Sequence, residues 1–586
     1  MRPCVAIVLL LIYVPAWGAT YYVDATGGND SNVGTATNNA WKTISKVNAS
    51  AFSAGDSILF KRGETWREPL VVSSSGLAGN PITFGAYGTG ALPVLMASTS
   101  KSNPIDWTAD ATVNIWFATG FPTDVGSIMV NGTTVLTGKV SAKASLNSQG
   151  KFWHNKSDSS VYMYSTSNPA TYYNNGIECW WKGIAASNGN IIYANGKNYL
   201  DFQDLELKYG GGHGIQLVDT TGSNIRRLTI SYVGGSYLTG TTRYGNGIEL
   251  WEGANTVTVE NNTVSQTFDE CLTSQSMGAV TRANITFQNN TGDKCGRAFA
   301  FSTNTGSPTI DNIYILNNTF TNSGLGWSVP AVSNGQGIGA MLNAPETTHG
   351  YFRGNTIRNT ASGADPIGQG ITIYGGEWIM SRNYLENTHN SSIRVHSDTT
   401  LKFNYNVVYG TGQSFFITSS VNSVNIYNNV FFNTSGSPWG TVTLGRDGFN
   451  VSNVVFKNNI IYDTANSNWT FRVSDNSTAI VGNNLYYDSD GTTTCHWSNG
   501  NNYTSKGTWQ AVSGETGSVW SNPLFVSTST PDFYLQSSSP AINAGTYVSL
   551  NSDYIGNAIQ GLPDIGAYEY QGILRKPFPP NSIRID

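Results

Sequence analysis

Short segments that alternate apolar and polar residues recur along the middle of the chain, and each carries an asparagine, often Asn-Asn. Period-two alternation predicts β-strands, and the Gly, Asn and Ser residues between the segments predict turns. A second apolar segment lies between successive copies, typified by GIEL at Gly247 and GITI at Gly370. Each repeat is therefore expected to hold at least two short strands and no helix. The aligned asparagines, 23 to 37 residues apart, are Asn262, Asn290, Asn318, Asn355, Asn383, Asn406, Asn429, Asn459 and Asn484.

Repeats of this length bury their apolar faces by stacking on one another. We expect an all-β fold, a right-handed parallel β-helix, with coils about 4.8 Å apart and apolar residues filling the interior. The recurrent asparagine is expected at a bend, where its amide bonds the asparagine of the next coil and forms an internal ladder. A propeller needs blades of about 40 residues, and a leucine-rich repeat needs a leucine consensus, so both describe this sequence less well.

The flanks depart from the repeat and divide the chain. Residues 1–19 predict a secretory signal peptide, with a basic start and an apolar run too short to span a bilayer. Residues 20–104 are interpreted as an N-terminal cap and first coils, with one short helix at WKTISKV, and 105–189 as a β-rich insertion. The β-helix core follows at 190–490, the C-terminal coils and cap at 491–570, and a tail at 571–586. The segments YYVDATGGNDSNVGT and LPDIGAYEY resemble the opening and the close of bacterial proteins of the pectin-lyase-like β-helix superfamily.

The composition agrees with an exported protein that meets sugars. The 586 residues include 32 Lys+Arg, 37 Asp+Glu, 16 Trp, 30 Tyr and 24 Phe. Because there is no basic surplus, nucleic acid is not expected as a partner. No segment after the signal is long and apolar enough for a membrane helix, so we expect a secreted monomer, extracellular or periplasmic, that binds a polysaccharide. The four cysteines that remain after the signal include no C-x-x-C pair, which argues against a structural zinc site.

Function on a β-helix is expected among outward side chains, which stack at about one strand spacing in successive coils. If Ile248 points inward, Glu249 points outward. The positions expected to match Glu249 are Gln216, Thr273, Ala300, Gly339, Thr372, Arg394 and Phe416. The densest group of acids and bases lies in three successive segments, which carry Asn246, Glu249 and Trp251, then Asp269 and Glu270, then Lys294 and Arg297.

Three of these segments resemble polygalacturonase-type glycoside hydrolases. They are Asn246-Gly247-Ile248-Glu249, Asp269-Glu270-Cys271 and Cys295-Gly296-Arg297. The resemblance implies a disulfide between Cys271 and Cys295 on adjacent coils. The chain departs from the family where Asn246 replaces an aspartate and Arg297 replaces a histidine. The Gly-His-Gly at Gly212–Gly214 precedes the acidic coils instead of following them, and Arg394-Val395-His396 lies several coils beyond the place of the family's Arg-x-Lys pair.

The first functional hypothesis is a glycoside hydrolase that needs no cofactor, with Glu249, Asp269, Glu270 and Arg297 as catalytic candidates. In inverting hydrolysis one carboxylic acid protonates the leaving oxygen while a carboxylate about 6.5 to 9.5 Å away activates water. Crowding of the three carboxylates is expected to raise at least one pKa, as a general acid requires. The candidate substrate-binding residues are His213, Asn246, Trp251, Lys294, Tyr374, Arg394 and His396, with Trp251 available to stack on a sugar ring.

Two other functions stay open. A lyase or epimerase acting on a uronate polymer would take Lys294, Arg297, Arg394 or His396 as base or charge neutraliser, and the acidic residues would then bind Ca²⁺. A non-catalytic, carbohydrate-binding surface β-helix would use none of this chemistry. In that case Asp269 and Glu270 would only pair with Arg297 of the next coil.

Overall fold

The computed structural model describes residues 18–183, 187, 189–240, 242–303, 309–328, 337–360, 368–410, 413–434, 436–445, 449–464, 467–489 and 491–572. The predicted signal peptide, apart from its last two residues, and the predicted tail beyond Gly572 lie outside these residues. No described helix is long and apolar enough to cross a membrane.

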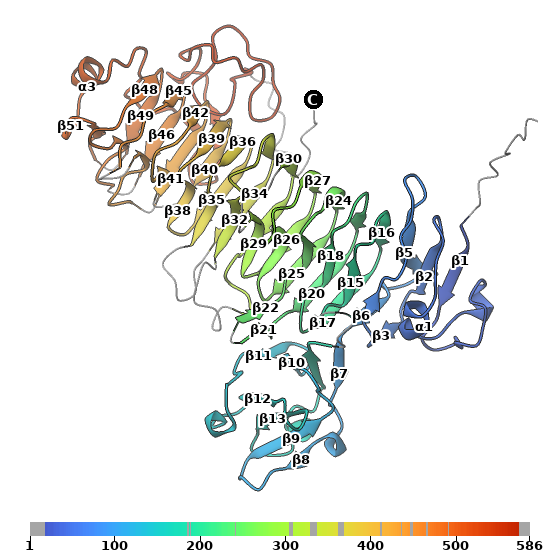
Figure 1. Cartoon of the computed structure of the whole chain (residues 1–586). Coiled ribbons are helices and arrows are strands. Elements are labelled where there is room, and N and C mark those ends of the chain that lie inside the picture. Colours follow the sequence, from blue (N-terminus) through green and yellow to red (C-terminus); the bar gives the residue numbers. More distant parts are fainter. Residues whose placement is uncertain are drawn as a thin grey trace, which may run out of the picture.

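Three long sheets run the length of the molecule, and each coil contributes one strand to each sheet in turn (Figure 1). Sheet 1 has 14 parallel strands in the described chain. They are β1 (Thr20–Val23), β2 (Ser57–Lys61), β5 (Ile82–Tyr87), β16 (Leu200–Gln203), β19 (Asn224–Arg226), β24 (Asn255–Glu260), β27 (Arg282–Gln288), β30 (Ile310–Leu316), β33 (Gly350–Arg353), β36 (Gly376–Ser381), β39 (Thr399–Asn404), β42 (Ser423–Tyr427), β45 (Val454–Lys457) and β48 (Ala479–Gly482).

Sheet 2 follows sheet 1 in each coil and has 13 described strands. They are β3 (Thr65–Trp66), β6 (Val94–Met96), β17 (Glu206–Gly210), β20 (Thr229–Val233), β25 (Thr263–Thr267), β28 (Thr291–Asp293), β31 (Thr319–Thr321), β34 (Thr356–Thr360), β37 (Tyr384–Thr388), β40 (Val407–Tyr409), β43 (Val430–Asn433), β46 (Ile460–Asp463) and β49 (Leu485–Asp488).

Sheet 3 completes the coil with 14 described strands, all parallel except for a final antiparallel pair, β50 and β51. They are β4 (Leu70–Val71), β15 (Ile192–Asn195), β18 (Ile215–Val218), β23 (Ile248–Trp251), β26 (Glu270–Ser276), β29 (Arg297–Thr303), β32 (Ile338–Asn343), β35 (Gln369–Ile373), β38 (Ser391–Val395), β41 (Gln413–Ile417), β44 (Val442–Leu444), β47 (Phe471–Val473), β50 (Cys495–Trp497) and β51 (Asn501–Tyr503). These sheets confirm the predicted all-β parallel solenoid, and a continuous apolar core fills its interior.

The predicted asparagine ladder forms at the bend between sheets 1 and 2. From Asn262 to Asn459, the backbone N–H and the side-chain amide of each ladder asparagine donate to the side-chain oxygen of the next one. The residue before each ladder position has a positive φ, as Asn289 does at 55°. Asparagine tolerates this left-handed conformation better than most residues. In an Asn-Asn pair the first residue therefore forms the bend and the second forms the ladder hydrogen bonds.

Glu515 ends the ladder. Its Oε1 accepts the backbone N–H and the side-chain amide of Asn484, at 3.1 and 2.9 Å. Its Oε2 accepts from the hydroxyl of Tyr486 at 3.0 Å and from the indole N–H of Trp509 at 2.5 Å. Trp509 belongs to α3 (Lys506–Ser513) and covers the end of the core beside Phe471. Burial raises the pKa of Glu515.

Two short helical elements lie between β1 and β2, the 3₁₀ helix η1 (Thr37–Asn39) and the α-helix α1 (Ile44–Asn48). The helix predicted at WKTISKV is α1. Thr43 begins it by accepting the backbone N–H of Lys46, and Ile44 and Val47 are buried in the core.

The β-rich inserted unit leaves the column between β6 of sheet 2 and β15 of sheet 3 and hangs from its side in Figure 1. It holds two four-stranded sheets with their own core. One contains β7 (Ser98–Ser100), β10 (Val125–Val130), β11 (Thr134–Leu136) and β14 (Ile177–Trp181), and the other contains β8 (Thr108–Ala109), β9 (Ile115–Thr119), β12 (Phe152–Asn155) and β13 (Ser160–Tyr164). Its helices are η2 (Pro104–Asp106), η3 (Lys143–Ser145) and α2 (Pro169–Tyr172). A hairpin of β21 (Ser236–Thr239) and β22 (Thr242–Tyr244) leaves a nearby coil at the same bend.

After α3 the chain turns back along the outside of the column. This segment includes the hairpin of β52 (Phe525–Ser527) and β53 (Asp532–Leu535). Its aromatic residues pack on the outer face of sheet 2, where Phe533 contacts Phe432 and Tyr409. The C-terminal segment therefore covers the side of the last coils as well as their end.

Candidate functional site

The acidic residues predicted from the sequence meet where sheet 2 turns into sheet 3, on neighbouring coils. Glu249 of β23 is in register with Gln216 of β18 and Thr273 of β26. Glu270, at the start of β26, is in register with Arg297 of β29. We refer to Glu249, Asp269, Glu270 and Arg297 as the carboxylate cluster. Parallel pairing thus brings together residues that are up to 48 positions apart in the sequence.

Glu249 points outward, as predicted, but it is only 2% exposed. Its Oε2 accepts from Gln216 Nε2 at 2.7 Å and lies 2.8 Å from His213 Nε2. The backbone N–H of Asn246 donates to His213 Nδ1, which puts the imidazole proton on Nε2, facing Glu249. Asn246 Nδ2 donates to the other carboxylate oxygen at 3.2 Å. Three donors therefore fix the Glu249 carboxylate in one orientation.

Arg297 joins the remaining two carboxylates of the cluster. Its Nη2 donates to Asp269 Oδ1 at 3.1 Å and forms a closer ion pair with Glu270 Oε1. The Glu270 side chain is fully buried, whereas 31% of the Asp269 side chain is exposed. Asp269 is thus the carboxylate of the cluster that is most open to a ligand.

Burial raises the pKa of Glu270 to about 8. Arg297 opposes this rise, and the negative charges of Asp269 and Glu249 add to it. The expected rise in the pKa of one carboxyl group is thus found at Glu270, and burial contributes more to it than the neighbouring negative charges do. A carboxyl group in this environment is protonated in much of the population at neutral pH.

Asn246 links the two halves of the cluster. Its side-chain oxygen accepts the backbone N–H of Glu270 at 2.9 Å, while its amide donates to Glu249. An aspartate at this position would repel Glu249 and lose the donor. Asparagine, in place of the aspartate of the polygalacturonase pattern, therefore suits a position next to the buried Glu249 carboxylate.

Aromatic residues form one wall of the site. The ring of Tyr244 meets the ring of His213 edge to face at 5.0 Å. Trp180 of the inserted unit packs against Trp327, which contacts Phe268 directly before Asp269. The inserted unit is therefore part of the surroundings of the cluster.

The structure distributes the other candidates over a wider area. Trp251 lies two residues beyond Glu249 on the same outward face of β23 and is half-buried. Lys294 is exposed, on the bend before Cys295, with a positive φ of 54°. Cys271 and Cys295 form the expected disulfide and tie the two bends of the cluster together.

Tyr374, Arg394 and His396 form a separate group. Arg394 is five strands along sheet 3 from Glu249, which corresponds to about 24 Å at the usual strand spacing. The rings of Tyr374 and His396 stack at 4.1 Å. Burial, with Arg394 nearby, lowers the pKa of His396 to about 4. These residues therefore do not join the carboxylate cluster.

One predicted alignment is wrong. Ala300 is in register with Met341, not with Gly339, and Met341 leads to Thr372 and then Arg394. The similarity of GIGA to GIEL suggested a register two residues too early. The small residue Ala340, and not Ile338, occupies the inward position opposite Phe299.

No group of three or more His, Cys, Asp or Glu residues suited to a metal ion occurs in the described part of the chain. In the carboxylate cluster the guanidinium of Arg297 lies between Asp269 and Glu270. A Ca²⁺ ion held by these two residues would compete with that cation for the same oxygens.

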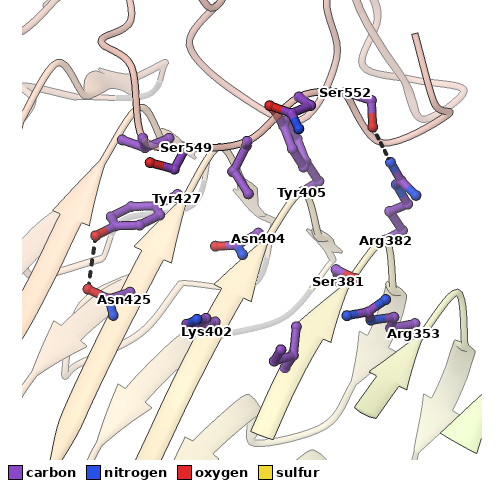
Figure 2. A pocket seen from close by; sticks show the side chains of 14 residues that line it. Arg353, Ser381, Arg382, Lys402, Asn404, Tyr405, Asn425, Tyr427, Ser549 and Ser552 are labelled. Atoms are coloured by element: carbon purple, nitrogen blue, oxygen red, sulfur yellow. Dashed lines mark hydrogen bonds between the residues drawn. The ribbon is translucent and has the colours of Figure 1, made fainter. Parts of the chain in front are cut away.

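A pocket that the sequence did not predict lies on the opposite side of the column. It lies between the outer face of sheet 1 and residues 548–552 of the C-terminal segment, with a volume of about 510 Å³ (Figure 2). Three cations line it, Arg353, Arg382 and Lys402. Each occurs one to four residues before a ladder asparagine, in GYFRGN, IMSRN and LKFNYN, and this recurrence of basic residues in three successive repeats was the available signal.

Comparisons with known proteins agree with the fold. The family described as "Right handed beta helix region" matches residues 159–348. The structure of XylC in complex with xylose has a TM-score of 0.53 at 12% identity and covers 95% of this chain and 99% of that one. The chain folds as a right-handed parallel β-helix.

One curated relative is similar over a short stretch. It is the lacto-N-biosidase of Bifidobacterium longum subsp. longum, 36% identical over 104 residues. The match covers 17% of this chain and 6% of the relative's length. A solved lacto-N-biosidase from Eubacterium ramulus is 14% identical, with a TM-score of 0.37, and the alignment covers 80% of this chain and 64% of that one.

Proposed function

We propose that the protein is a secreted, monomeric enzyme that degrades a polysaccharide, a glycoside hydrolase acting at the carboxylate cluster without a cofactor. Neither nucleic acid nor a membrane is a partner in this proposal. The observation that carries it is the meeting of three carboxylates in different environments on neighbouring coils, beside an outward tryptophan. The short similarity to a protein named as a lacto-N-biosidase agrees with action on a glycan.

The environments divide the catalytic roles. Glu270, whose pKa is raised to about 8, holds a proton near neutral pH and donates it to the leaving oxygen. Asp269, the more exposed carboxylate, attacks the anomeric carbon as the nucleophile, and water then releases the sugar: both carboxyl groups contact Nη2 of Arg297, which is too close for the inverting mechanism and suits the retaining one. Arg297 touches both groups and orients them.

The surrounding residues position this pair and the substrate. Glu249, fixed by His213, Gln216 and Asn246, acts as a positioning residue through Asn246, which also holds the backbone of Glu270. Trp251 offers a ring surface for sugar stacking. Lys294 borders the site, while Tyr374, Arg394 and His396 would contact only a longer chain that runs along sheet 3.

A lyase is the second candidate, and a specific observation favours it. His396 is uncharged at neutral pH because burial and Arg394 lower its pKa to about 4, so its imidazole is available as a base. Arg394, three strands or more from the carboxylate cluster, would neutralise a uronate carboxyl group next to that base. Such β-elimination would take place at the Tyr374–Arg394–His396 group.

The chemistry of the products distinguishes the candidates. Purified protein is incubated with a panel of neutral and acidic polysaccharides, and both new reducing ends and ultraviolet absorbance are measured. Hydrolysis gives reducing ends without absorbance, whereas elimination also gives the absorbance of an unsaturated uronate. Asp269→Asn is expected to lower the activity at least 100-fold. Glu377→Gln is the matched control, because Glu377 is an exposed carboxylate of sheet 1.

Each remaining outcome counts against the hydrolase. Unsaturated products that persist in Asp269→Asn and vanish in His396→Gln would establish the lyase. Binding of a glycan without any cleavage, unchanged in Asp269→Asn and Glu249→Gln, would establish the non-catalytic alternative.

A further inference from the structure

The pocket between sheet 1 and the C-terminal segment has an ordered floor and an ordered wall. Its floor is the outer face of four successive strands, β33, β36, β39 and β42, and its far wall is residues 548–552 (Figure 2). Arg382 fixes this wall, because its Nη2 donates to Ser552 Oγ at 2.6 Å and its Nε donates to the backbone oxygen of Asp553 at 3.1 Å. A wall anchored by two hydrogen bonds keeps the cavity open between two ordered surfaces.

The pocket is cationic. Arg353, Arg382 and Lys402 line it, no carboxylate does among its described lining residues, and none of the three cations makes an ion pair within the described chain. The nearby Asp553 forms no ion pair with them, and its carboxylate accepts the backbone N–H groups of Ile555, Asn557 and Glu569. In the described chain, three positive charges thus face one cavity without a carboxylate in ion-pair contact.

The pocket also holds buried polar atoms that lack partners. Asn404 is 6% exposed, and its side-chain oxygen receives no hydrogen bond within the described chain. The buried Nε of Arg353 likewise has no acceptor in that part of the chain. Figure 2 shows the Asn404 side chain near the centre of the floor, between Tyr427 and Ser381 of the adjacent strands. An unpaired buried acceptor and an unpaired buried donor are costly unless a ligand or bound water satisfies them.

Hydroxyl and aromatic groups surround these charges. The hydroxyl of Tyr427 donates to Asn425 at 2.9 Å, and Ser381, Ser549 and Ser552 also line the cavity. At the edge, the guanidinium of Arg353 lies 4.8 Å over the ring of Tyr351, which stacks on Tyr314 at 5.0 Å. Mixed amide, hydroxyl and aromatic groups are suited to the hydroxyls and faces of a sugar.

We infer that this pocket binds an acidic saccharide, a segment of one to three sugar units that carries carboxylate or sulfate groups. Arg353 and Lys402 bind the acidic groups, and Asn404 accepts a hydroxyl. A volume of about 510 Å³ greatly exceeds what a free phosphate or sulfate ion fills. The pocket lies on sheet 1 and the carboxylate cluster lies on sheet 3, so this inference does not rest on the proposed function.

Binding of short probes tests the inference directly. Isothermal titration with the full-length protein uses trigalacturonate, a sulfated chondroitin tetrasaccharide, neutral cellotriose and inorganic sulfate. Asp269→Asn serves as the background, so that turnover does not change the signal, and any binding at the carboxylate cluster is common to the parent and to the pocket variants. Arg353→Gln and Lys402→Gln, two side chains that carry no bond to the pocket wall, remove one charge each.

A matched control comes from the same face of the molecule. Lys457 of β45 is in register with Tyr427 but lies beyond the pocket, so Lys457→Gln removes an equal charge nearby. Far-ultraviolet circular dichroism and the melting temperature are expected to stay unchanged in all three variants, because none of these side chains makes an ion pair in the described chain.

We expect at least one of the two acidic probes to bind, and Arg353→Gln and Lys402→Gln each to weaken it tenfold or more, with Lys457→Gln within twofold of the parent. Preference for trigalacturonate or for the sulfated probe tells the two acidic groups apart. Equal binding of cellotriose, or loss of affinity in Lys457→Gln alone, would overturn the inference. Binding of inorganic sulfate as tight as that of both saccharides, or no binding of any probe, would overturn it as well.

Discussion

Replacing Glu515 with glutamine tests whether the end of the asparagine ladder is held by a carboxylate. Four donors converge on Glu515: the backbone and side-chain N–H groups of Asn484, the hydroxyl of Tyr486 and the indole of Trp509. A carboxylate accepts from all four, whereas glutamine offers one oxygen and one NH₂ group. If the oxygen keeps Asn484, the NH₂ group faces the indole N–H of Trp509, which can only donate.

The expected cost follows from that one unpaired contact. A buried donor without an acceptor costs about 1–3 kcal/mol, and 2 kcal/mol corresponds to a roughly 30-fold change in the local opening equilibrium. The effect is expected at the C-terminal end of the column, because each coil contacts only its neighbours. Ladder amides several coils away, such as that of Asn318, keep their own partners.

Hydrogen exchange measured by mass spectrometry resolves this position dependence. In Glu515→Gln, peptides that contain Asn484 are expected to lose about 30-fold in protection, while peptides that contain Asn318 keep the protection of the parent. Glu377→Gln is the control for loss of a surface charge. Unchanged exchange at Asn484 would show that the carboxylate does not hold the end of the ladder. An equal loss of protection at Asn484 and Asn318 would show that its effect is not confined to the last coils.

Three further predictions concern the carboxylate cluster and its supports. Because the pKa of Glu270 in the folded protein is raised to about 8, its contribution to stability is present at acid pH and is lost as pH rises to that value. In Arg297→Gln the pKa of Glu270 rises further, so this loss of stability continues above pH 8. The difference in melting temperature between the parent and Arg297→Gln is therefore expected to widen above pH 8 by about 1 °C per pH unit. Arg282→Gln, which removes another buried arginine, is the control, and its difference in melting temperature from the parent is expected to stay constant from pH 7 to 9. An equally constant difference for Arg297→Gln would contradict the pairing of Arg297 with Glu270. Replacing both Cys271 and Cys295 by serine is expected to cost about 3 kcal/mol, seen as a fall of roughly 3 °C in the melting temperature, because the bridge closes a loop with a sequence separation of 24; an unchanged melting temperature would count against it. Chelation with EDTA is expected to leave hydrolysis within about twofold, since the guanidinium of Arg297 already occupies the oxygens of Asp269 and Glu270 that a metal ion would need, and a loss of more than tenfold would show that a metal takes part.

The fold was predictable because one residue type repeats at one structural position. The Asn-Asn pairs combine a left-handed bend with a ladder side chain, so the bends between sheets 1 and 2 could be located from the sequence. Alternation then identified the inward residues, with Ile248 and Leu250 in the core and Glu249 outward. The misplaced Gly339 shows the limit, since an alternating pattern of small residues does not define the register.

The burial of the cluster could not be predicted in the same way. Glu249 has few exposed atoms because His213 and Gln216 of the preceding coil and Asn246 of its own coil converge on its carboxylate. Those contacts depend on which coils pair and on how bends of different length lie against one another. The pocket on sheet 1 was missed for a related reason, since its wall comes from the C-terminal segment about 150 residues further along the chain.

The most direct measurement of the central claim is the dependence of Glu270→Gln on the leaving group. The glycan found in the panel is compared with a dinitrophenyl glycoside of the same sugar, which needs no protonation to leave. If Glu270 is the general acid, kcat/KM is expected to fall about 1,000-fold on the glycan but less than about tenfold on the dinitrophenyl glycoside, and the alkaline limb near pH 8 should disappear. An equal loss on both substrates, or full activity on the glycan, would contradict the account.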